Sequence, residues 1–112
     1  MEYISSDTNI WIDFSVVNAL ELPFRLDCTY LMSRDALEDE WLSPKGRGTE
    51  LADLGLQTVE ITTEEFYYAD EIHNQHPKLS VYDTFALAIA KFRSIVLLTG
   101  DGRLRKAAAE EG

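Results

Sequence analysis

Short apolar runs alternate with longer amphipathic stretches along the chain. Four of these runs have the length and residue types of β-strands: Tyr3–Ser6, Cys28–Met32, Gln57–Ile61 and Ser94–Thr99. The fourth run is continuously apolar, which is typical of a central strand in a parallel sheet. Because a helical stretch separates each strand from the next, the pattern predicts a three-layer α/β/α sandwich with a central, mainly parallel sheet of about four strands.

The helical stretches carry start and stop signals at their ends. Thr62 and Glu65 have the spacing of a capping box, and Ser80 is a favoured N-cap for the stretch that follows it. Gly55 suits a helix C-terminus, where a left-handed backbone is common. The stretch after Ser80 is apolar on nearly all sides, so we expect that helix to be buried. The expected helices are Asn9–Leu22, Ser33 or Asp35 to about Leu42, Thr49–Leu54, Thr63–Asn74, Val81–Phe92 and Arg103–Glu110.

The length of 112 residues predicts a single domain over residues 1–112, and a hydrophobic content of 46% is enough to build a core. Cys28 is the only cysteine, which excludes a disulfide within the chain. With no secretory signal at the N-terminus, this cysteine usage favours the reducing cytoplasm. No apolar run approaches the length of a membrane span, so no membrane partner is expected.

The net charge of −10 is unevenly distributed, and this changes what it implies about partners. Residues 1–75 carry sixteen acidic and four basic side chains, whereas residues 76–106 carry two acidic and six basic ones. Phosphate contacts need local positive charge, so the overall charge argues against nucleic acid as a partner. The basic third could supply that charge, although an ordinary solvated surface explains the asymmetry equally well.

Four carboxylates stand at or near the ends of the predicted strands and helices. Asp7 follows the first strand directly, and Asp101 follows the fourth. Glu40 lies on the helix after the second strand, and Asp83 lies in the first turn of the helix that Ser80 opens. Because ligands bind at the carboxyl ends of parallel strands, these four groups could meet in one crevice. Each also has a local explanation, as a helix cap, a turn residue or part of a solvated helix face.

Taken as a set, the four carboxylates favour a metal site. Convergent carboxylates repel one another, and one of them would stay protonated unless a cation compensates. Oxygen-only ligation, without His or Cys, suits the hard cations Mg²⁺ and Mn²⁺. Such an ion binds phosphate and activates water, so the set favours metal-assisted phosphodiester hydrolysis. Three cations follow Asp101 closely and could guide a phosphate backbone: Arg103, Arg105 and Lys106.

Four segments that contain these carboxylates carry a resemblance. They are Ser6-Asp-Thr-Asn-Ile-Trp11, the acid-rich helix ending in Glu40-Trp41, Leu79-Ser-Val-Tyr-Asp-Thr84 and Leu97-Leu-Thr-Gly-Asp101. Together they resemble the PIN domain, the nuclease fold of VapC-type toxins and of RNA-processing endonucleases. The resemblance implies acidic metal ligands at Asp7, Glu40, Asp83 and Asp101, and supporting polar roles for Asn9 and Thr99. It also implies that the protein is a Mg²⁺- or Mn²⁺-dependent endoribonuclease, with RNA as its substrate. The resemblance to VapC-type toxins implies a role as the toxin of a toxin–antitoxin pair, with an antitoxin protein as partner.

The sequence departs from the PIN pattern at its C-terminus. PIN domains usually continue past the last helix into another strand, whereas this sequence stops at Gly112. We therefore expect the final strand to be missing and a sheet edge to be exposed. That edge and the aromatic helix Thr63–Asn74 favour a homodimer. Phe66, Tyr67 and Tyr68 on this helix could stack bases, but a position in the core or in a dimer surface is the better prediction.

Two other functions stay open on these residues. A truncated PIN-like module could bind a protein or RNA partner without catalysis. Another acidic α/β phosphate enzyme or a receiver-like signalling domain is the least favoured alternative. A receiver domain needs an aspartate at the end of a middle strand, whereas the third strand here ends in Ile61-Thr-Thr63.

Overall fold

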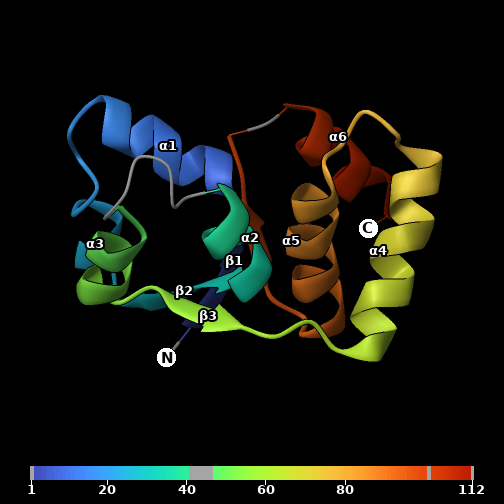
Figure 1. The fold of residues 1–112 in the computed structure, drawn as a ribbon, viewed down its shortest axis with the longest axis horizontal. Helices are drawn as coiled ribbons and strands as arrows, with labels where there is room; N and C mark the ends of the chain where they lie inside the picture. The colour runs from blue at the N-terminus through green and yellow to red at the C-terminus, as the bar shows by residue number, and fades with distance from the viewer. Residues whose placement is uncertain (1, 41–46, 101, 112) are drawn as a thin grey trace.

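The computed structural model describes residues 2–40, 47–100 and 102–111. Within these ranges, four parallel strands lie between two layers of helices (Figure 1). The strands are β1 (Glu2–Ser6), β2 (Cys28–Ser33), β3 (Gln57–Val59) and β4 (Val96–Leu98), in the spatial order β3-β2-β1-β4. The helices are α1 (Thr8–Val16), α2 (Arg34–Glu40), α3 (Arg47–Leu54), α4 (Thr63–Gln75), α5 (Val81–Phe92) and α6 (Gly102–Glu111), and a 3₁₀ turn covers Pro23–Arg25. The predicted α/β sandwich is confirmed.

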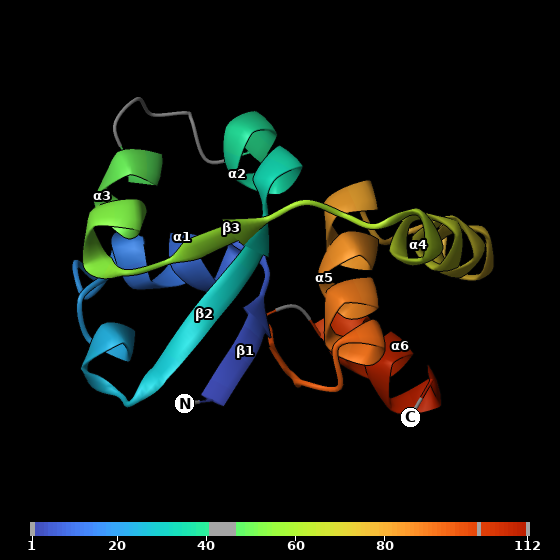
Figure 2. The same ribbon diagram turned by 90° about the horizontal axis from the view of Figure 1, so that it is seen from below.

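The helices divide between the two sides of the sheet. Figure 2 shows α1 and α3 on one side and α5 and α6 on the other, with α4 outside α5. Because the strands are parallel, their carboxyl ends share one edge of the sheet, formed by Ser6, Ser33, Val59 and Leu98. We call this the carboxyl edge. None of the helices in the described ranges has both the length and the apolar character that a bilayer crossing requires.

The layer that contains α1 and α3 is organised around Trp11, which is fully buried. Its ring stacks on Phe24 at 5.1 Å between centroids and meets the edge of the Tyr30 ring, also at 5.1 Å. The indole Nε1 donates a 3.0 Å hydrogen bond to Ser6 Oγ, and that hydroxyl donates to the Leu31 carbonyl oxygen at 2.9 Å. A buried indole needs such a partner. These bonds therefore fix the last residue of β1.

The opposite layer is organised around α5, in which every residue from 83 to 90 is buried. The predicted N-cap is present, because Ser80 Oγ accepts a 3.1 Å bond from the Asp83 N–H and Asp83 Oδ2 accepts one of 3.1 Å from the Ser80 N–H. Ser5 of β1 donates its hydroxyl to the Ala86 carbonyl oxygen at 2.8 Å. This buried contact joins the middle of α5 to a central strand of the sheet.

The first helix is shorter than its sequence predicts. It was expected to reach Leu22 but ends at Val16, because Asn18 adopts a left-handed backbone with φ of 56°. The N–H groups of Asn18 and Ala19 bond back to the carbonyl oxygens of Ser15 and Phe14, which closes the helix. Asparagine tolerates this conformation better than most other residues with a Cβ.

The apolar run Ser94–Thr99 was predicted to form a central strand, and this is wrong. β4 lies at an end of the described sheet, with Val96 59% exposed. The run is apolar because its alternate residues meet both helical layers, Leu97 on the α5 and α6 side and Leu98 on the Trp11 side. β3 also ends at Val59 instead of Ile61. In both cases the local residue pattern does not fix strand order or strand length.

Candidate functional site

Asp7 lies at the carboxyl edge, where β1 ends and α1 begins. Its side chain is 2% exposed, and Oδ1 accepts a 2.9 Å hydrogen bond from the Ile10 N–H. The predicted N-cap is therefore present. Serine or asparagine would cap a helix equally well. Capping therefore accounts for an acceptor at this position, and a metal role for Asp7 has to be argued from its other contacts.

A residue at the end of β4 also binds Asp7. The Thr99 hydroxyl donates a hydrogen bond to Asp7 Oδ2, and the Asp7 N–H donates to the Leu98 carbonyl oxygen at 3.4 Å. The ends of the first and fourth strands therefore meet, as their parallel arrangement requires. A carboxylate has about four acceptor positions, so these bonds are compatible with a cation on the same group. Asn9, the other predicted supporting residue, is exposed in the first turn of α1.

Asp83 approaches the same edge from α5. This helix leads back to the start of β4, which is parallel to β1, so α5 runs opposite to β1. From the contact between Ser5 and Ala86, Asp7 lies roughly 6.6 Å further along the strand direction. Asp83 lies three residues from Ala86, roughly 4.5 Å, in the same direction along α5. Both steps lead to the carboxyl edge, and Asp83 is 9% exposed there.

The structure says less about the other two predicted carboxylates, Glu40 and Asp101. Glu40 is the last residue of α2, and its side chain lies outside the described part of the structure. Asp101 lies outside the described residues. Among the described residues, no group of three or more His, Cys, Asp and Glu side chains could hold a metal ion. The described part of the candidate site therefore consists of Asp7, Asp83 and Thr99.

Comparison with models of known protein families identifies the family of this chain. The model of the PIN domain matches residues 15–110. The chain belongs to the PIN-domain family. Comparison with curated proteins and with solved structures gave no match.

Membership of this family bears on the chemistry of the carboxyl edge. PIN domains are generally nucleases, and they typically use divalent metal ions. The matched region includes Glu40, Asp83 and Asp101 but begins after Asp7. The case for Asp7 therefore rests on its burial and its bond from Thr99. Carboxylate and hydroxyl oxygens are donors that suit Mg²⁺ and Mn²⁺, so the described residues fit such an ion.

One carboxylate of this PIN domain that lies near the site was not singled out from the sequence. Asp13 projects from α1 toward the connection that follows β4, where a Cβ added to Gly100 would lie 2.7 Å from Asp13 Oδ2. Gly100 stands between Thr99 and Asp101, so its lack of a side chain lets α1 approach the segment that carries both residues. No local motif marks this contact, because the two residues lie far apart in the sequence.

The cations predicted to bind RNA lie on α6 of the PIN domain. Leu104 and Ala107 are fully buried, whereas Arg103, Arg105 and Lys106 are exposed. The helix therefore packs through its apolar side and presents the cations to solvent. This exposure is what contact with a phosphate backbone requires.

Proposed function

We propose that this PIN domain is a Mg²⁺- or Mn²⁺-dependent endoribonuclease. The observation that supports this best is the buried Asp7 carboxylate at the carboxyl edge, bound by Thr99 from the neighbouring strand end. A cation at this edge would offset the repulsion between carboxylates that converge there. The approach of Asp83 to the same edge from α5 adds a second carboxylate to the site.

The proposed metal ligands are Asp7, Glu40, Asp83 and Asp101. An ion held by them would stabilise charge on the attacked phosphate and activate a water nucleophile. The bonds from Ile10 and Thr99 orient the Asp7 carboxylate before any substrate arrives. The exposed cations of α6 attract the phosphate backbone: Arg103, Arg105 and Lys106.

We propose that the protein acts in the cytoplasm as the toxin of a toxin–antitoxin pair, with an antitoxin protein as its second partner. The resemblance of its four carboxylate-bearing segments to VapC-type toxins supports this role. A homodimer is also proposed, through the side of β4 that no described strand covers, where Val96 is 59% exposed, together with the exposed Tyr3 of the neighbouring β1. Light scattering at micromolar concentration tests the dimer, and a strict monomer would contradict it.

A cleavage assay with fluorescent single-stranded RNA tests the catalytic proposal. The parent should cut RNA in Mg²⁺ or Mn²⁺, and EDTA should stop it. Asp83→Asn keeps an acceptor for the Ser80 N–H but removes the charge, so it should abolish cleavage while melting close to the parent. Asp27→Asn, which changes an exposed carboxylate just before β2, is the matched control and should cut like the parent. A folded parent that cuts nothing in a varied RNA pool would favour the non-catalytic alternative.

A further inference from the structure

A pocket of about 420 Å³ shares helix α5 with the candidate site, and the proposed metal chemistry does not use it. Its walls include Arg34 at the start of α2, Ile61 in the β3–α4 connection, Phe66 and Tyr67 on α4, and Phe85 on α5. Figure 2 shows this connection passing from the side of α2 toward α5 and α4. The volume is within the range of pockets that bind small organic groups.

A row of aromatic rings joins this pocket to the first turn of α5. Tyr82, the neighbour of Asp83, meets Phe85 at 5.9 Å between ring centroids. Phe85 lies 6.4 Å from Phe66, which in turn lies 6.0 Å from Tyr67. The row therefore begins beside a proposed metal ligand and ends on the surface of α4.

The two rings on α4 are open to solvent. Phe66 is 51% exposed and Tyr67 is 67% exposed, which excludes a core position for both. Tyr68 has a different environment, because it is partly buried and its hydroxyl donates a 3.0 Å hydrogen bond to Glu111. Exposed aromatic faces beside a groove are the surfaces on which proteins stack unpaired bases.

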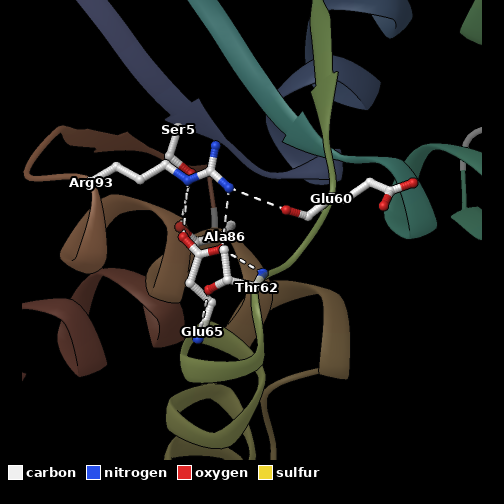
Figure 3. A network of polar contacts seen from close by, with 6 residues as sticks. All are labelled: Ser5, Glu60, Thr62, Glu65, Ala86 and Arg93. Carbon is white, nitrogen blue, oxygen red and sulfur yellow. Dashed lines mark hydrogen bonds and ion pairs between the residues drawn. The ribbon is translucent and has the colours of Figure 1, made fainter.

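A network of polar contacts fixes the first turn of α4, the backbone that carries both rings (Figure 3). Glu65 Oε1 accepts a 2.9 Å bond from the Thr62 N–H, and Thr62 Oγ1 accepts one of 3.1 Å from the Glu65 N–H. Arg93 donates to both carboxylate oxygens of Glu65, at 2.9 and 3.2 Å, and to the Glu60 carbonyl oxygen at 3.2 Å. A platform fixed in this way loses little conformational entropy when it binds a ligand.

A guanidinium completes the pocket on the side of the carboxyl edge. Arg34 follows β2, whose neighbour in the sheet is β1. It pairs with Glu60 at 3.1 Å, and the two side chains are 59% and 79% exposed. Such an exposed ion pair contributes little to stability. The guanidinium is exposed enough to meet a phosphate or to lie flat against a base, as Arg does in RNA complexes.

We propose that this pocket stacks an unpaired base of the RNA strand whose phosphate lies at the carboxylates. The inference rests on the proposed ribonuclease function and adds the course of the strand, from Asp83 past Tyr82 and Phe85 to Phe66 and Tyr67. Every base has a π face, so the pocket selects single-stranded over double-stranded RNA without choosing a sequence.

The test measures RNA affinity by fluorescence anisotropy in an Asp7→Asn background with Mg²⁺, so that cleavage does not intervene. One labelled strand carries bases and a matched strand of the same length is abasic, with the same phosphates. Tyr67→Ala should weaken binding of the base-bearing strand by about 5- to 100-fold and leave the abasic strand unaffected. Tyr67→Phe keeps the ring and should restore binding. Phe92→Ala, at an exposed ring outside this pocket, should bind like the parent.

The outcomes separate this inference from the proposed catalysis. Equal affinity of Tyr67→Ala and the parent for the base-bearing strand would overturn the inference, even if metal-dependent cleavage is observed. A Tyr67→Ala variant that loses self-association but not RNA affinity would identify the face as a protein interface and overturn the inference too. The predicted affinity pattern in a protein that cuts no RNA would support the pocket and count against the catalytic proposal.

Discussion

Loss of Arg93 should destabilise the fold more than loss of any exposed cation, because Glu65 would be left buried without its partner. Glu65 is 1% exposed, and Arg93, whose side chain is 30% exposed, binds both of its oxygens. Removing one member of a buried ion pair costs about 3–5 kcal/mol, and the partial exposure of Arg93 favours the low end of that range. We therefore expect Arg93→Ala to cost about 3 kcal/mol at pH 7, which lowers the melting temperature of a domain of this size by about 10–15 °C.

The destabilisation should depend on pH in a defined direction. Burial by itself raises the pKa of Glu65, but the hydrogen bonds from Arg93 and Thr62 and the charge of Arg93 outweigh it and hold the pKa below its ordinary 4.5. A carboxyl whose pKa is lowered in the folded state stabilises the fold above about pH 4.5, and that contribution is lost as the pH falls through the folded value. In Arg93→Ala only burial and the capping bond act on the carboxyl, so protonation relieves it. The difference in unfolding free energy between parent and variant should therefore shrink below pH 4.5.

Urea denaturation followed by circular dichroism at pH 7 and pH 4 measures both effects. Arg34→Ala removes an exposed partner of Glu60 and is the matched control, with an expected cost below about 1 kcal/mol at either pH. Adding Glu65→Gln to Arg93→Ala removes the buried charge but keeps an acceptor for the Thr62 N–H, so it should recover part of the loss. A cost for Arg93→Ala no larger than that of the control, or one that does not change with pH, would refute this explanation.

Two further predictions concern the backbone at the ends of α1 and β4. Gly100→Ala would place its Cβ against Asp13 Oδ2, so we expect reduced RNA cleavage with a small loss of stability. Adding Asp13→Ala should partly restore cleavage, and no recovery in the double variant would show that the contact is not the cause. Asn18→Ala should lower the unfolding free energy measured in urea by about 1 kcal/mol, because residue 18 has a left-handed backbone, whereas Asn18→Gly should remain near the parent. Equal losses of stability in both variants would contradict this account of the helix end.

Local sequence signals predicted the helices well, because the interactions that begin them lie within one turn. The capping boxes at Thr62 and Ser80 are both present, and the Val81–Phe92 helix has its predicted bounds. The ends of α1 and β3 and the edge position of β4 depend on tertiary packing. A run of apolar residues indicates a strand, but it does not show which strands lie beside it or how far it is covered.

The sequence predicted those parts of the candidate site that follow directly from the strand topology. Parallel strands predict that the ends of β1 and β4 share one edge, and the bond between Asp7 and Thr99 agrees. The contacts of Arg93 with Glu65 and of Asp13 with the Gly100 segment carry no local signal, since each joins distant parts of the chain. Exposure of the rings at Phe66 and Tyr67 also depends on which face of α4 meets α5, and sequence alone left that face undetermined.

Metal-dependent RNA cleavage by Asp7→Asn, measured beside the parent, tests the central claim most directly. The carbonyl oxygen of the asparagine side chain keeps the N-cap acceptor for the Ile10 N–H, and its amide NH₂ can donate to the Thr99 hydroxyl oxygen, which reverses that bond. The variant should therefore fold and melt close to the parent in the absence of metal. The account predicts that the parent cuts single-stranded RNA in Mn²⁺, and that Asp7→Asn cuts none and is no longer stabilised by Mn²⁺. Cleavage by a folded Asp7→Asn at the rate of the parent, with an equal rise in melting temperature on adding Mn²⁺, would contradict it.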